Sequence, residues 1–175
     1  MNVLSERQIE TRPLTSEFFA EYGDIIEKGD RFQFINDGAC KRYNDLARLD
    51  CDSHGRMGIS LFEAEIRTFP YELTMMERHP RGSQAFLPLS TASLLVIVAS
   101  DIGGTPGLPE AFESLPYQGV NIHRDVWHGV LTPLSGSGLF AVVDWIGPCA
   151  NLETHQFQQG FVVNRGQSIG GTKNS

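Results

Sequence analysis

The sequence lacks the features that mark membrane, secreted or nucleic-acid-binding proteins. No stretch approaches the roughly 20 consecutive apolar residues that a membrane-spanning helix needs, and the first residues, MNVLSERQIETRP, have no apolar core of a signal peptide. Basic residues are in deficit, since 14 Lys and Arg stand against 21 Asp and Glu, a net charge of -7. Such a charge repels phosphate backbones and anionic lipids. We therefore expect a cytoplasmic protein that binds neither nucleic acid nor a membrane.

Cysteine is also scarce. Cys40, Cys51 and Cys149 form an odd set without CxxC spacing, which argues against a disulfide framework and against a zinc knot. We expect three reduced thiols. A catalytic role for Cys149 is a minor alternative, because buried or incidental thiols are commoner.

Apolar material is sufficient for one core. A chain of 175 residues, 41% of them apolar, is in the usual range for one domain. We predict a single domain over residues 1–165. The remaining residues, 166–175, are too polar to bury themselves and are expected to be mobile.

Short apolar or alternating runs, separated by Gly, Pro, Asn and Asp, dominate the chain. The pattern predicts many short strands and hence a mainly β protein, a sandwich or a barrel. Candidate strands are 31–35, 58–64, 71–77, 84–88, 94–99, 119–123, 126–131, 139–145 and 157–163. One short helix is predicted over 17–22, capped by Ser16 and stopped by Gly23, and a second one over 110–113.

The run 93–100, SLLVIVAS, is apolar on both of its alternating faces. Such a strand must be covered on each side. Two interpretations stay open: contact with a second subunit, which would make a homodimer, and a central strand in the core of a monomer.

Three of the five histidines, His79, His123 and His128, fall in two polar segments beside predicted strands. In the first segment, Glu77 and His79 share one face of an extended chain, while Arg78 points the other way. Gln84 begins the next strand after a turn. If the two strands are hairpin neighbours, three polar groups converge on one patch, which is costly inside a barrel unless something polar binds there. A solvated hairpin end is the alternative.

In the second segment, Asn121 and His123 share one face of an alternating stretch, and a turn then leads to Trp127 and His128. Amide and imidazole groups beside a tryptophan are typical of small-molecule sites, where an aromatic wall limits water. A lone histidine is usually a satisfied core or surface residue, but two clusters together favour function.

These segments resemble the motifs of cupin barrels. Glu77-x-His79-x4-Gln84 lies where cupins carry their first motif, normally His-x-His followed by Glu, and His128 falls where the second motif ends in histidine. The resemblance implies a cupin-like, jelly-roll β-barrel. The carboxylate and the amide weaken the preference for tightly held iron or zinc. Glu77, His79, Gln84 and His128 are candidate ligands of a divalent ion, or equally of a hydroxy acid, and no organic cofactor is expected.

More closely, the chain resembles the ureidoglycolate lyase family. The matching stretches are FINDG at 34–38, RYNDL at 42–46, ERHP at 77–80, GxQAFxP at 82–88 and GVNxHRxVWH at 119–128. Departures fall mostly in the connection 103–109 and in the tail. The resemblance implies an enzyme that splits ureidoglycolate into glyoxylate and urea, as in the breakdown of allantoin.

That reaction needs a base for the carbinol proton, an acid for the departing nitrogen and a group that holds the carboxylate. We hypothesise that His79, His123 and His128 transfer protons and that Glu77 orients a neighbouring imidazole or acts directly. The candidate substrate-binding residues are Gln84 and Asn121 for the ureido group, Arg124 and Arg42 for the carboxylate, and Phe86 and Trp127 as apolar walls. Core filling by the aromatics and an exposed turn position for Arg124 are the alternatives.

Two other classes of protein stay open. A metal-dependent cupin, such as an oxygenase or a sugar isomerase, would use the same pocket with a bound ion. A small-molecule sensor is the non-enzyme alternative, but neither a DNA-binding helix pair nor a basic segment accompanies the predicted barrel.

Overall fold

Strands make up nearly all the regular structure of this chain. The computed structural model describes residues 7–167, and within them the single helix is α1, Ser16–Phe19. The longer strands are β1 (Gln8–Pro13), β5 (Arg56–Glu63), β6 (Tyr71–Arg78), β7 (Gln84–Pro88), β8 (Leu94–Ala99), β15 (Leu139–Ile146) and β16 (Glu153–Asn164). The shorter ones are β2 (Gly23–Ile26), β3 (Gln33–Ile35), β4 (Cys40–Arg42), β9 (Asp101–Ile102), β10 (Thr105–Pro106), β11 (Glu110–Glu113), β12 (Gly119–Ile122), β13 (Trp127–His128) and β14 (Thr132–Pro133).

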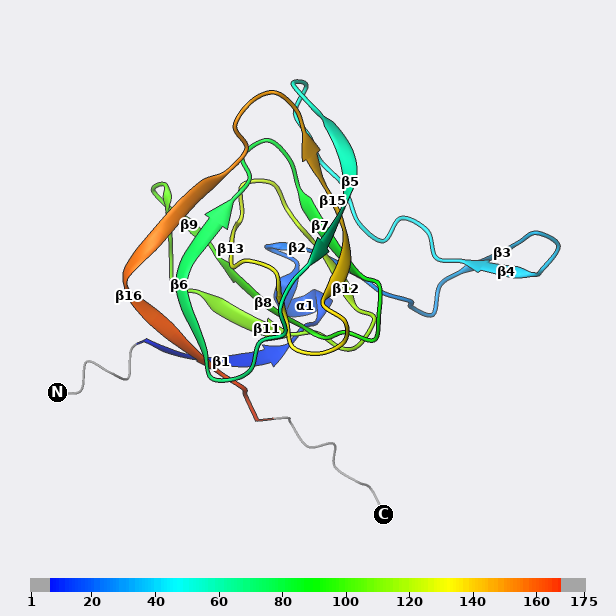
Figure 1. The fold of residues 1–175 in the computed structure, drawn as a ribbon. Coiled ribbons are helices and arrows are strands. Elements are labelled where there is room, and N and C mark those ends of the chain that lie inside the picture. Colours follow the sequence, from blue (N-terminus) through cyan, green and yellow to red (C-terminus); the bar gives the residue numbers. More distant parts are fainter. Residues whose placement is uncertain (1–6, 168–175) are drawn as a thin grey trace, which may run out of the picture.

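One sheet closes on itself. Its hydrogen-bonded order is β11-β1-β16-β6-β13-β8, and β8 pairs back to β11, so six strands form a closed barrel of mixed direction. Figure 1 shows this ring on the left of the molecule. Its interior is filled by apolar side chains from five of the strands, among them Leu73, Ile97, Ala111, Trp127 and Phe161.

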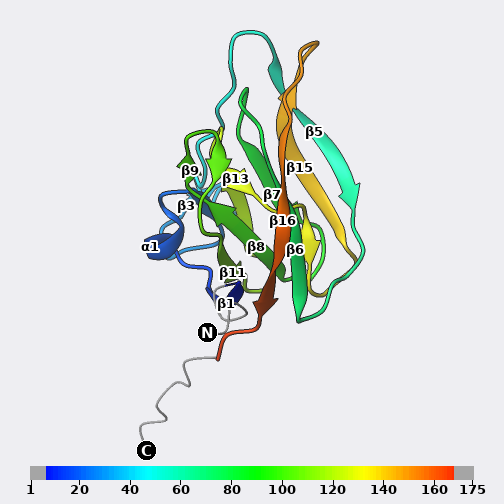
Figure 2. The same cartoon turned by 90° about the vertical axis from the view of Figure 1, so that its left-hand side faces the viewer.

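A second sheet, ordered β2-β12-β7-β15-β5, packs against the outside of the barrel. Phe86, Val120 and Phe140 from this sheet meet Val98 and Phe112 from the barrel in a second buried core. In Figure 2, β5 and β15 run along one side of the molecule and α1 lies at the other. The expected mainly β, cupin-like barrel is confirmed.

Strand β8 explains the doubly apolar run. All six of its residues are buried. Val96 and Val98 point into the core between the sheets, whereas Leu95 and Ile97 point into the barrel. The interpretation as a central core strand is confirmed, and β8 offers no free face for a second subunit.

Both helix predictions need correction. Residues 110–113 form β11, because Ala111 pairs with Ile97 and fills the barrel while Phe112 fills the core between the sheets. Tertiary pairing thus overrides local propensity. The first helix ends at Phe19, and Thr15 occupies its N-cap position.

Gly23 serves a strand rather than a helix end. It opens β2 and pairs with Ile122 of β12. A Cβ at this position would lie 2.1 Å from the carbonyl oxygen of Asn121. Glycine is therefore required because the two backbones approach closely.

A two-stranded hairpin projects from the body. It consists of β3 and β4, which pair with each other and with no other strand of the described part. Figure 1 shows it extending to the right, away from both sheets. We call residues 31–46 the arm.

Two sequence expectations concern the ends and the membrane. Most of the predicted mobile tail lies outside the described residues, which end at 167, and the amide of Gly166 donates a hydrogen bond to Oγ1 of Thr11. The described part contains no helix with the length and apolar character needed to span a bilayer.

Candidate active site

Glu77 and His128 are cross-strand neighbours on the outside of the barrel. β6 pairs with β13 in a register that places Glu77 directly opposite His128, and such partners point to the same side of a sheet. His128 is also paired with Val98, whose side chain lies in the core between the sheets. The carboxylate and the imidazole therefore face the second sheet.

His79 completes a group of three potential proton carriers. Its ring lies 5.2 Å from that of His128, centroid to centroid. Its Nε2 lies 3.9 Å from Oε1 of Glu77, too far for a direct hydrogen bond but close enough for electrostatic attraction. The polar strips predicted around His79 and His128 thus meet in one place.

Backbone carbonyls fix the orientation of both imidazoles. Nδ1 of His79 lies 2.7 Å from the carbonyl oxygen of Asn151, and Nδ1 of His128 lies 2.9 Å from that of Gly129. A carbonyl only accepts hydrogen bonds, so Nδ1 carries the proton in each neutral ring. The Nε2 atom of each neutral ring is left as a lone-pair acceptor. In His79 this Nε2 is buried and has no hydrogen-bond partner among the described residues.

The second sheet supplies an amide and another carboxylate. Gln84 shares its face of β7 with Phe86, and Asp144 follows Phe140 and Val142 along the inward face of β15. Gln84 and Asp144 are neighbours in this wall, and the Gln84 side chain acts to lower the pKa of Asp144. Oε1 of Gln84 and Oδ1 of Asp144 are buried and lack partners within the described residues. Buried polar atoms of this kind are normally satisfied, so a polar ligand belongs between the two sheets.

Burial shifts the charge states of this group. Desolvation lowers the pKa of His128 to about 4, with a further contribution from neighbouring His79. Desolvation also raises the pKa of Glu77 and the pKa of Asp144, against the opposing influence of His79 on both. The site therefore holds a neutral His128 and two carboxyl groups that take up protons more readily than exposed ones.

A cavity of about 490 Å³ opens beside these residues. Glu77, Gln84 and Phe86 line it, together with Phe62 and Glu63 of β5. Its described lining includes two glutamates and no basic residue. An adjoining cavity of about 480 Å³ contains Arg67, which is paired with Glu65.

The donor set also fits a divalent cation. Glu77, His79 and His128 each offer a ligand atom, and these atoms lie within 4.8 Å of one another. The unpartnered Oε1 of Gln84 is a further oxygen donor of the kind such ions accept. These are the four residues expected from the cupin resemblance.

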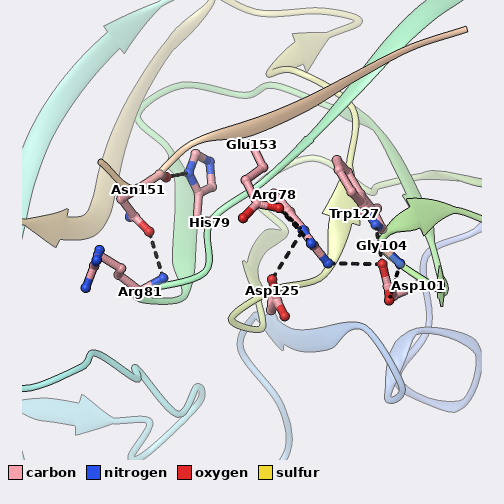
Figure 3. A network of polar contacts seen from close by, with 9 residues as sticks. All are labelled: Arg78, His79, Arg81, Asp101, Gly104, Asp125, Trp127, Asn151 and Glu153. Carbon is pink, nitrogen blue, oxygen red and sulfur yellow. Dashed lines mark hydrogen bonds and ion pairs between the residues drawn. The ribbon is translucent and has the colours of Figure 1, made fainter. Parts of the chain in front are cut away.

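Arg78 holds the surrounding loops in place. Figure 3 shows its guanidinium turned away from His79 and paired with Asp101, Asp125 and Glu153. The guanidinium also lies over the ring of Trp127, 4.6 Å from its centroid. These contacts hold the end of β6 in place. Arg78 therefore positions Glu77 and His79, the residues on either side of it in the chain.

Asn121 and His123 form a separate polar group. Both contact Oδ2 of Asp24, at 2.9 and 3.3 Å. Val120 and Ile122, the residues that alternate with them on β12, point into the core between the sheets. Asn121 and His123 therefore lie on the outer face of the second sheet, across the sheet from Gln84.

Three other expected site residues also point elsewhere. Arg124 lies on the surface, with its Nε 3.6 Å from a carboxylate oxygen of Asp50. Arg42 is exposed on the arm. Trp127 fills the barrel, and its Nε1 donates to Asp101.

Sequence reasoning missed two residues. Asp144 is the single carboxylate in the apolar strand LFAVVDWI. A lone carboxylate in such a strand could have indicated a buried polar role. Asn151 orients His79 through its backbone carbonyl, and no side-chain pattern reveals such a contact.

The fold and this site together define a cupin-like protein whose acid and imidazole groups gather between barrel and second sheet. The chain belongs to the ureidoglycolate lyase family, since the family model described as Ureidoglycolate lyase matches residues 6–164. A Rhodobacter capsulatus protein named ureidoglycolate lyase is 55% identical over 82% of this chain and 89% of its own length. Ureidoglycolate lyase 2 of Rhizobium meliloti is 49% identical, covering 87% and 94%. The ureidoglycolate lyase of Chelativorans sp. is 42% identical, covering 90% and 97%.

Proposed function

We propose that this chain is a lyase that converts ureidoglycolate into glyoxylate and urea. Three findings support the proposal: the family, the site, and relatives named ureidoglycolate lyase that match this chain over most of their length. One observation carries the chemistry: a buried Nε2 of His79, free to accept a proton, lies beside the Glu77 carboxyl.

The reaction moves one proton from oxygen to nitrogen. His79 Nε2 accepts the carbinol hydroxyl proton, the C–O bond becomes a carbonyl, and the bond from that carbon to the ureido nitrogen breaks. The imidazolium of His79 then returns its proton to the departing nitrogen, which completes urea. Glu77, when ionised, stabilises the imidazolium across 3.9 Å.

His128 has a different part in this scheme. Its pKa of about 4 keeps it neutral near pH 7, so it is a poor proton store but a constant lone-pair donor. Its Nε2 accepts a hydrogen bond from an N–H of the ureido group. As an alternative to proton transfer by His79, a divalent ion held by Glu77, His79, His128 and Gln84 would occupy the Nε2 lone pairs and supply Lewis-acid polarisation of substrate oxygens.

Gln84 and Asp144 recognise the ureido group. Their unpartnered oxygens are two hydrogen-bond acceptors on the same wall. The ureido group presents N–H donors that match them. Phe86 supports this wall from the core and lines the cavity.

A cytoplasmic location and a homodimeric state complete the proposal. Cys40, Cys51 and Cys149 are exposed free thiols, which suits a reducing compartment. The support for a second copy lies in the arm and is developed below.

Product analysis tests the proposed reaction. Purified protein is mixed with synthetic ureidoglycolate, and urea and glyoxylate are measured by coupled assays together with dissolved oxygen. We expect equal amounts of both products without oxygen consumption. His128→Ala should lose most of the urea release while keeping the circular dichroism spectrum. Stoichiometric iron with oxygen consumption would instead favour a cupin oxygenase, and substrate affinity without urea would indicate a sensor.

A further inference from the structure

The cavity has the wrong charge for its proposed substrate. Ureidoglycolate carries a carboxylate, yet the described lining includes Glu77, with Asp144 close behind. Without a bound metal ion, an anion in such a cavity needs a cationic side chain near it. Nearby Arg78, Arg81 and Arg124 are engaged with the carboxylates of Asp101, Asp52 and Asp50, respectively.

The arm carries exposed apolar and basic side chains that its own body does not cover. Phe34 is 63% exposed, and Phe32 packs edge-on against it at 5.2 Å. Lys41 lies over the Phe32 ring, 4.4 Å from its centroid, and Arg42 follows it in β4. An ordered hairpin with such a surface, projecting into solvent, is typical of an interaction element.

A complementary surface lies on β5 of the same chain. β5 is an edge strand of its sheet, and Ile59 and Leu61 are 77% and 65% exposed on its outer face. Glu63 comes next on that face, and Glu65 follows. This apolar and acidic surface matches the apolar and basic arm. Phe62 and Glu63 also line the cavity, so this end of β5 lies beside it.

We propose that the arm of one copy docks on β5 of a second copy, and that its Arg42 binds the substrate carboxylate at that copy's cavity. Reciprocal docking gives a closed dimer in which each active site is completed by the other chain. Guanidinium suits this role because it can bind a carboxylate through two hydrogen bonds. The role of Arg42 rests on the proposed function, whereas the docking surface does not.

Sedimentation measures the interface by itself. Wild-type protein is expected to sediment as a dimer. Phe34→Glu on the arm and Leu61→Glu on β5 should each give folded monomers, because each puts a charge into an apolar contact. A monomeric wild type, or dimers in both variants, overturns the docking surface regardless of any activity.

Subunit mixing tests whether Arg42 acts in the second copy's site. Arg42→Ala and His128→Ala are each expected to lose activity alone. After exchange of subunits, about one quarter of wild-type turnover should return, since half the dimers are mixed and each has one intact site. If Arg42 acted within its own chain, the mixture would stay inactive, and this result overturns the proposal.

Glyoxylate binding separates this inference from the proposed function. Calorimetry with glyoxylate should show wild-type affinity in Arg67→Ala and at least tenfold weaker affinity in Arg42→Ala. Loss of binding in Arg67→Ala alone would place the carboxylate in the adjoining cavity instead. If the wild type binds glyoxylate in this pattern but releases no urea, the lyase assignment fails and the assignment of Arg42 stands.

Discussion

Replacing His128 with leucine should change the pH dependence of folding stability in a defined direction. The folded protein holds this imidazole at a pKa of about 4, against 6.5 for an exposed one. As the pH falls below 6.5, the unfolded chain binds a proton that the folded chain excludes, so the folded state loses stability down to about pH 4. Above pH 6.5 the imidazole is neutral in both states, and the folded protein has the full stability that it loses at lower pH.

The size of the effect follows from the shift. A difference of roughly 2.5 pKa units corresponds to about 3 kcal/mol, at 1.36 kcal/mol per unit. His128→Leu has no proton to bind there. The raised pKa values of Glu77 and Asp144 act with the opposite sign but are present in both proteins. They largely cancel when the variant is subtracted from the wild type.

Guanidinium unfolding in EDTA from pH 7.5 to pH 4 measures the difference. We expect the wild type to lose up to about 3 kcal/mol relative to His128→Leu over this range. The control is His54→Leu, which removes an exposed imidazole and keeps His128, and the wild type should show no such loss relative to it. A wild-type minus His128→Leu difference that does not change with pH would refute the reasoning.

Three further changes test other parts of the account. Asp144→Asn should raise KM for ureidoglycolate about tenfold, because an amide N–H replaces an acceptor oxygen; an unchanged KM would exclude Asp144 from substrate binding. Trp127→Phe should cost about 1 kcal/mol of stability by losing the 2.8 Å hydrogen bond to Asp101. It should leave kcat/KM unchanged, and reduced turnover in a fully folded variant would return Trp127 to the site. Calorimetry with Mn²⁺ should show binding to the wild type and none to His79→Asn, whereas equal binding would contradict the donor set.

The local sequence pattern was sufficient to predict the bounds of some strands. The bounds of β7 and β8 follow from their apolar runs. Both strands contribute buried side chains to the cores described above. The helix predicted over 110–113 failed because its two apolar residues are divided between those cores. Only the pairing partners of a strand reveal such a division.

The site shows the same limit. Alternation correctly placed Glu77 apart from Arg78, which turns to the acidic cluster in Figure 3. Gln84 was expected from a hairpin with β6, but β7 belongs to the other sheet and faces β6 across the core. Spacing along the chain cannot distinguish two paired strands from two facing ones. For His123, alternation identified a shared face with Asn121 but not which side of the sheet that face is on.

The most direct test of the central claim is the catalytic effect of the two imidazoles acting together. In His79→Asn and His128→Asn, the new amide can still donate to the backbone carbonyl but the lone pair at Nε2 is gone. We predict that each variant lowers kcat/KM for urea release by roughly 10² to 10⁴, and that the double variant loses little more than the worse single one. Undiminished turnover in either single variant, or losses that simply multiply, would contradict a shared site.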